Sequence, residues 1–233
     1  MSTILNIETS SRICSVAVSR DGMVEYQLED MEGMKHAERL APFVEKCMQE
    51  MSRREMKLDA VAVSMGPGSY TGLRIGLSTA KGLCMGLSVP LIGVDTLQLL
   101  AVKAMFRSMD WEGDEILVPM VDARRMEVYT AAYDFALREL LPPQPMILDS
   151  GSYAELIAGG KAYFMGDATA KAKSVITSPE AHWIDGIEAH ARDMVALAEK
   201  AFRESRFIDP AYSVPYYCKE YQTTTPRNRV LGK

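Results

Sequence analysis

The sequence has 233 residues, 48 % of them hydrophobic and 24 % charged, a composition typical of globular proteins with one large domain or two small lobes. Its net charge is -5, and it has no basic stripe of the kind that proteins binding nucleic acid alone usually carry, so we expect RNA to be contacted only through a partner. It also shows no secretory signal pattern and no apolar segment long enough to span a bilayer, which predicts a cytoplasmic protein without membrane contact.

The cysteines and histidines do not form a metal-binding pattern. The four cysteines are far apart in sequence and form no CxxC pair, so we expect them to be small buried hydrophobic residues in a reducing compartment. The three histidines are also separated, and no HExxH motif is present. The sequence therefore predicts no metal site and no cofactor held by the chain alone.

The first elements predict a small antiparallel sheet followed by a helix. Apolar, β-branched runs over 4–7, 13–19 and 23–28, with a turn at Asp21-Gly22, indicate a three-stranded meander. The stretch 36–51 has helical periodicity and places five apolar residues on one face, namely Leu40, Val44, Cys47, Met48 and Met51. Further on, the sequence predicts a strand over 59–64, a glycine-rich loop, a helix over 70–87, a strand over 89–94 and a helix over 96–105.

The second half begins with the same pattern as the first. After a charged stretch over 110–115, a strand over 116–121, a polar turn and a strand over 126–133 repeat the opening arrangement, which indicates an internal duplication. We then expect a stiff proline-rich connector over 142–145, a helix over 152–158, a strand over 162–165 and a helix over 189–203. The predicted organisation is a first lobe over 1–108, a smaller second lobe over 109–208 whose final helix is able to pack back on the first, and an extended tail over 209–233, disordered past about residue 223.

The loop Gly66-Pro67-Gly68-Ser69-Tyr70-Thr71-Gly72 follows a predicted strand and opens a helix. Glycines allow close backbone approach, and helix N-terminal amides attract anions, so Gly66, Gly68, Ser69 and Gly72 are candidate contacts for an anion or nucleotide. The spacing matches neither GxGxxG nor GxxxxGK[ST], and it also fails GxSxG. A tight strand-to-helix turn with Ser69 as the N-cap explains the loop equally well.

The helix after this loop contains two pairs of glycines, each pair four residues apart and therefore on one face: Gly72 with Gly76, and Gly82 with Gly86. Each interior glycine costs about 1 kcal/mol relative to alanine, so close packing against another helix must compensate. A neighbour within the chain or a partner protein would serve. We expect a partner interface formed by Leu40, Val44, Cys47, Met48, Met51, Gly72, Gly76, Leu83 and Gly86, which also predicts a homodimer when the chain is alone.

Three segments together resemble one family. The loop GPGSYTGLRIG, the opening ILNIETSSRICSVAV and the segment VDARRMEVYTAAY are similar to the bacterial tRNA threonylcarbamoyladenosine biosynthesis family TsaB, formerly YeaZ and often labelled a glycoprotease. The resemblance implies the α/β, two-lobed actin/Hsp70/sugar-kinase fold, in which each lobe is a mixed sheet flanked by helices. It also implies a degenerate sibling of the catalytic subunit TsaD, with that subunit and a TsaE-like ATPase as partners.

The sequence departs from the catalytic sibling at the metal site. The sibling holds its metal with an HxxxH pair after a strand equivalent to 91–94, and here Thr96 and Leu100 stand at those positions. Leucine cannot ligate a metal, so the resemblance implies a non-catalytic subunit. Glu8 and Asp122, one in each hairpin, match the actin-like carboxylate pattern, so weak ATP or ADP binding in a degenerate cleft or at the partner interface stays open.

Three functions therefore compete. The first is a non-catalytic scaffold in the complex that forms N6-threonylcarbamoyladenosine in tRNA. The second is a metallopeptidase of the glycoprotease type, which the missing ligands disfavour. The third is a free-standing weak ATPase, which the small second lobe disfavours because it leaves little room for a full nucleotide cleft.

Overall fold

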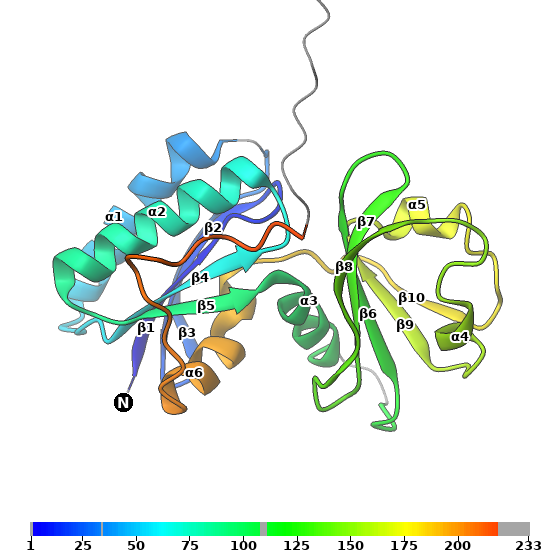
Figure 1. The fold of residues 1–233 in the computed structure, drawn as a ribbon. Helices are drawn as coiled ribbons and strands as arrows, with labels where there is room; N and C mark the ends of the chain where they lie inside the picture. The colour runs from blue at the N-terminus through cyan, green and yellow to red at the C-terminus, as the bar shows by residue number, and fades with distance from the viewer. Residues whose placement is uncertain (1, 34, 108–110, 219–233) are drawn as a thin grey trace, which may run out of the picture.

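The computed structural model describes residues 2–33, 35–107 and 111–218, and it contains two five-stranded sheets with helices around them (Figure 1). The first sheet has the order β3-β2-β1-β4-β5, formed by β1 (Thr3–Glu8), β2 (Cys14–Arg20), β3 (Met23–Asp30), β4 (Ala60–Gly66) and β5 (Leu91–Asp95). The second has the order β10-β9-β6-β7-β8, formed by β6 (Ile116–Asp122), β7 (Glu127–Tyr133), β8 (Glu139–Ile147), β9 (Ala162–Gly166) and β10 (Ala181–Ile184). The helices are α1 (His36–Arg53), α2 (Tyr70–Leu87), α3 (Thr96–Met105), α4 (Ala154–Ile157), α5 (Thr169–Lys173), the 3-10 helix η1 (Ala191–Met194) and α6 (Val195–Arg203).

The two sheets have the same topology. In the first, β1 pairs antiparallel with β2 and β2 with β3, while β1, β4 and β5 run parallel. In the second, β6, β7 and β8 form the antiparallel part, and β6, β9 and β10 run parallel. The internal duplication that the sequence indicates is therefore present as a repeated sheet.

Alternation along the strands separates the two faces of the first sheet. Leu5 and Ile7 point into the apolar core beneath α1 and α2, whereas Ile4 points into the core formed by α3, η1 and α6. The second core continues into the second sheet through residues such as Leu117 and Met165, so α3 lies between the two sheets (Figure 1). Helices α2 and α3 each begin at a side-chain N-cap. Ser69 Oγ accepts from the Gly72 amide at 3.2 Å at the start of α2, and Asp95 Oδ1 accepts from the Gln98 amide at 2.8 Å at the start of α3.

Several boundaries differ from the sequence prediction. The proline-rich segment 142–145 is not a connector, because it lies inside β8, an edge strand that tolerates residues without an amide hydrogen. The short elements α5 and β10 were not predicted, since neither shows a clear periodicity. The predicted helix over 189–203 is divided into η1 and α6, which pack against β1, β2 and β5 of the first sheet.

The chain after α6 returns across the first sheet. Ile208 forms an isolated antiparallel bridge with Leu91, and the segment 209–218 then runs back over α2 (Figure 1). The expected disorder past residue 223 lies outside the described residues. Among the helices that the structure describes, none contains a stretch long and apolar enough to cross a membrane.

Candidate functional site: the glycine loop and the interlobe cleft

The glycines after β4 face the turn between β1 and β2. A Cβ added at Gly68 would overlap the carbonyl of Ser10, one at Gly72 the carbonyl of Thr9, and one at Gly76 the hydroxyl of Thr9. The Ser69 amide donates to the Ser10 carbonyl at 2.6 Å, which fixes the loop against the same turn. The close approach that these three glycines permit is therefore to the turn after β1, through backbone carbonyls at Gly68 and Gly72 and through the Thr9 hydroxyl at Gly76. Gly72 and Gly76 are buried against this turn, which leaves them inaccessible to a partner helix.

The other side of the loop is covered by the C-terminal segment. Gly66 has a φ of +103°, and a Cβ there would overlap the carbonyl oxygen of Tyr216. The Tyr216 amide donates to the Met65 carbonyl at 2.7 Å. The need for glycine at these positions is explained by close packing against the turn after β1 on one side and against the C-terminal segment on the other. This agrees with the interpretation of the loop as a tight strand-to-helix turn. Nucleotide contact by Gly66, Gly68, Ser69 and Gly72 stays a prediction.

Glu8 ends β1 and is fully buried. One of its carboxylate oxygens accepts from the Ser10 amide, and Oε2 has no hydrogen-bond partner among the described atoms. Burial raises the pKa of the Glu8 carboxyl above its usual range, against the opposing hydrogen bonds from the turn. Glu8 stabilises the turn after β1 and does not line the cleft between the lobes, so its expected place in a nucleotide cleft is corrected.

Asp122 ends β6, and its side chain is half exposed. It pairs with Lys171 and accepts from the Arg124 amide at 2.9 Å, so its charge is already balanced within the second lobe. Asp122 does not line the cleft either. Two acidic residues of the second lobe line it instead, Asp167, which follows β9 and accepts from the Asp122 amide at 2.8 Å, and Glu188.

Asp167 was not among the predicted site residues. Burial raises the pKa of its carboxyl above the usual range. The signal that could have found it is the Gly166-Asp167 pair at the end of a predicted strand, because parallel neighbours such as β6 and β9 end at the same edge of a sheet.

A small pocket lies between the lobes, beside the turn after β1. It is lined by the turn residues Ser10, Ser11 and Arg12, by α3, and by Val121, Asp167, Glu188 and Ala189, and it encloses about 20 Å³. That volume suits a single water molecule, since a water needs roughly 10–15 Å³ by the same measure. Arg12 Nη2 and Glu188 Oε1 form an ion pair of 2.9 Å across it.

Thr96 and Leu100 stand one turn apart on α3 and both line this cleft. Thr96 Oγ1 has no hydrogen-bond partner among the described residues, and Leu100 is almost fully buried. The two positions at which the resemblance places the sibling's histidines are therefore together in the cleft and hold a hydroxyl and an alkyl group. Among the described residues, no group of three or more His, Cys, Asp or Glu side chains is arranged to hold a metal ion.

Most of the predicted partner face on α1 is wrong. Leu40, Val44, Cys47 and Met51 are buried in the core of the first lobe, because this face of α1 packs against β2 and β3. Met48 lies beside that core and is half-buried.

The C-terminal half of α2 is different. Leu83 is half-buried against the same core, whereas Met85 and Leu87 are 69 % and 46 % exposed. A Cβ added at Gly82 or at Gly86 would meet no atom of the described residues within 4 Å. The predicted interface therefore retains Met48, Leu83 and Gly86 as accessible residues, joined by Gly82, Met85 and Leu87.

Comparison with known proteins bears on the whole chain. The chain is 28 % identical over 229 residues to "tRNA threonylcarbamoyladenosine biosynthesis protein TsaB" of Escherichia coli, covering 93 % of this chain and 94 % of that protein. The structure named "YeaZ from Pseudomonas aeruginosa" superposes with a TM-score of 0.77 at 26 % identity, covering 93 % of this chain and 100 % of that one. The chain is similar to TsaB/YeaZ proteins over nearly its whole length. The TsaB protein of Bacillus subtilis is 32 % identical over 149 residues, covering 63 % of this chain and 62 % of that protein.

This similarity confirms the resemblance drawn from the glycine loop and the two hairpins. The repeated mixed sheets flanked by helices confirm the α/β, actin/Hsp70/sugar-kinase-like fold. Residues 31–144 also match a family model described as "TsaD: tRNA N6-adenosine threonylcarbamoyltransferase". The match spans α1, α2 and α3, so this chain is similar in sequence to that transferase family over the helices around the glycine loop and the cleft.

Proposed function

We propose that this protein is a non-catalytic scaffold subunit for the formation of N6-threonylcarbamoyladenosine in tRNA, and that it pairs with a TsaD-like catalytic subunit. The names of its E. coli and B. subtilis relatives support the role in this tRNA modification. In this proposal the TsaE-like ATPase and tRNA are met through the assembled complex, which suits a chain with a net charge of -5.

One observation supports the binding of a partner protein. Gly82 and Gly86 lie on one face of α2, each costs the helix about 1 kcal/mol relative to alanine, and no atom of the described residues packs where their side chains would be. Packing within the chain therefore does not compensate that cost. A helix of another protein laid along this face would, since glycines four apart let two helix backbones approach closely.

Neighbouring apolar residues suit the same use. Met85 and Leu87 are exposed apolar side chains on the same helical segment as the two glycines, and Leu83 on α2 and Met48 on α1 are half-buried against the core of the first lobe. Methionine adapts to different partner shapes and is common at binding surfaces. We name this set, with Gly82 and Gly86, the α2 patch; in the absence of the catalytic subunit it would pair two copies of the chain.

The cleft supports the non-catalytic part of the proposal. Thr96 and Leu100 offer no imidazole, and the pocket that they line encloses about 20 Å³, far less than the usual size of a site for a small molecule. The peptidase and free ATPase alternatives would each need a site that neither Glu8 nor Asp122 supplies in its observed position.

The test is light scattering on the full chain, alone and mixed with the TsaD-like subunit of the same organism. The double variant Gly82→Leu/Gly86→Leu blocks close approach while favouring the helix, so it should fold and yet lose hetero-association at least tenfold. Met85→Glu should act in the same direction. Met23→Glu, a change at a similarly exposed methionine (67 %) on β3, is the matched control and should bind normally.

Normal hetero-association by the double variant would contradict the α2 patch. A separate experiment tests the non-catalytic role by measuring the formation of N6-threonylcarbamoyladenosine in tRNA. The chain alone should form no modified adenosine, and a reconstituted system should form none when the chain is omitted. Modification in the absence of the TsaD-like subunit would contradict the scaffold role.

A further inference from the structure

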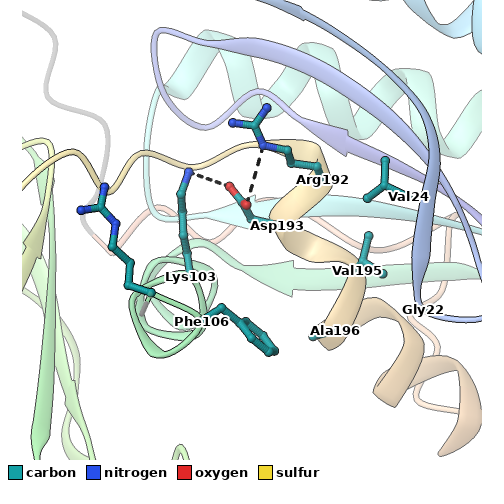
Figure 2. A pocket seen from close by; sticks show the side chains of 9 residues that line it. Gly22, Val24, Lys103, Phe106, Arg192, Asp193, Val195 and Ala196 are labelled. Carbon is teal, nitrogen blue, oxygen red and sulfur yellow. Dashed lines mark ion pairs between the residues drawn. The ribbon is translucent and has the colours of Figure 1, made fainter. Parts of the chain in front are cut away.

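A pocket of about 410 Å³ lies on the face of the first sheet opposite α1 and α2 (Figure 2). It is formed by the turn between β2 and β3, the C-terminal end of α3, and the start of η1 and α6. Its size falls within the range of about 300–1,000 Å³ that is usual for sites of small molecules. None of the residues of the α2 patch lines it, so a complex formed through that patch would leave it open.

The lining carries three cationic side chains, Lys103, Arg107 and Arg192, against one carboxylate, Asp193. Lys103 Nζ is held by Asp193 Oδ2 at 2.7 Å and by the Glu188 carbonyl at 2.8 Å. Although the protein has a net negative charge, this pocket contains a cluster of cationic side chains. The excess makes the pocket attractive to an anion.

Two of the cations keep donors to spare. Within the described residues, the contacts of Arg192 with acids are long: Nη1 lies 3.4 Å from Oε1 and 3.3 Å from Oε2 of Glu29, which lies outside the lining, and Nε lies 4.0 Å from Asp193 Oδ1. Arg107 forms no ion pair with any residue in the described ranges. Since an arginine presents five N–H donors in a planar fork suited to carboxylate and phosphate, Arg107 and Arg192 are the groups that a bound anion would engage.

The opposite wall of the pocket is apolar. Phe106 follows α3 and is 76 % exposed, and it lies across from Val195 and Ala196 in Figure 2, away from the Lys103–Asp193 pair. Val24, on β3, is 43 % exposed. An exposed aromatic ring beside a cluster of cations offers a stacking surface for a planar group and donors for an acidic one.

We propose that this pocket binds a nucleoside monophosphate, with the phosphate held by Arg107 and Arg192 and the base stacked on Phe106. A phosphate monoester carries a charge of about -1.5 to -2 at pH 7, which suits a lining with two more cations than carboxylates. A bounded pocket holds a free nucleotide better than a continuous strand, which would need a groove that tracks its backbone. This site is independent of the scaffold role.

Isothermal titration calorimetry of the full chain with AMP, adenosine, inorganic phosphate and a short single-stranded RNA tests the assignment. We expect AMP to bind more tightly than either adenosine or phosphate. Arg107→Gln/Arg192→Gln should weaken AMP binding at least tenfold, since each arginine loses charge-assisted hydrogen bonds. Phe106→Ala should weaken AMP binding about fivefold or more and leave phosphate binding unchanged.

Matched controls are Arg53→Gln on α1 and Phe207→Ala, which change an exposed arginine and an exposed phenylalanine outside the lining. Both should bind AMP as the unaltered chain does. Phosphate binding as tightly as AMP, binding of the RNA alone, undiminished binding by both pocket variants, or no heat with AMP at millimolar concentration would each overturn the assignment. Circular dichroism confirms that each variant is folded, which the exposure of Phe106 leads us to expect for its alanine variant.

Discussion

The carbonyl oxygen of Thr9 occupies the place where a side chain at position 72 would begin, so Gly72 lets the first turn of α2 rest directly on the turn between β1 and β2. A backbone carbonyl cannot move aside as the end of a long side chain can. Gly72→Ala should therefore destabilise the protein by about 1–3 kcal/mol, the usual cost of overpacking. Urea denaturation measures this change in the free energy of unfolding, as a shift of the denaturation midpoint with an unchanged m-value.

Gly82→Ala is the matched substitution on the same helix. In the part of the chain that the structure describes, no atom lies within 4 Å of the added Cβ, so only the gain in helix propensity remains and the variant should be more stable by about 0.5–1 kcal/mol. Equal effects at positions 72 and 82 would contradict the distinct environments assigned to the two pairs of glycines.

Asp95, the N-cap of α3, gives a prediction about pH. Burial raises the pKa of its carboxyl to about 6 from an ordinary value of 3.8, so the folded state binds the proton more tightly than the unfolded state does. The stability that this group contributes is complete below pH 3.8 and is lost as pH rises through about 6.

Asp95→Asn keeps an efficient N-cap and removes the titration. The stability of the variant relative to the unaltered chain should therefore rise between pH 4 and pH 7, measured by urea denaturation at each pH. Because Glu8 and Asp167 also have raised pKa values, the comparison is the difference between the two proteins and not the pH profile of either. A difference that stays constant with pH would disprove the assignment to Asp95.

Arg74 holds the C-terminal segment on α2. Its Nε donates to the Tyr217 hydroxyl at 2.9 Å, and its guanidinium lies 4.0 Å from the centre of the Tyr70 ring. Arg74→Ala should loosen the segment and speed hydrogen exchange of the Tyr216 amide about fivefold, as the loss of about 1 kcal/mol implies. Lys81→Ala, which removes only a 3.4 Å contact to the Ala211 carbonyl, should change that rate much less, and equal rates in the two variants would argue against Arg74 as the anchor.

Metal content tests the non-catalytic assignment from another side. The chain has Thr96 and Leu100 where the resemblance places a pair of histidines, so the purified protein should carry far less than one equivalent of zinc or iron after dialysis. Elemental analysis makes the measurement. One equivalent of either metal, retained through dialysis, would contradict the scaffold proposal.

Periodicity and turn chemistry were enough for most of the fold. The boundaries of α2 and α3 agree with the predicted ranges 70–87 and 96–105, because Ser69 and Asp95 are strong N-caps placed before regular apolar patterns. The repeated hairpins, read from two stretches of strand, turn and strand, indicated the duplicated sheet. The elements that the sequence missed, α5 and β10, are too short to show a period, and β8 was mistaken for a connector because its prolines are tolerated only at an edge.

The residue types were enough to infer the family resemblance and the absence of the histidine pair, since both inferences depend on which residues stand at given positions. Which face each residue presents was decided only by the tertiary structure. Leu40 and Val44 are apolar residues that could pack equally well against a sheet or against a partner protein. Gly72 and Gly86 are both glycines on α2, yet the Thr9 carbonyl occupies the position of a side chain at Gly72, whereas no atom of the described residues does so at Gly86. The physical reason is that burial and close approach depend on segments distant in sequence. The turn after β1, the strand beneath α1 and the segment 209–218 take their places beside these helices only when the chain is folded.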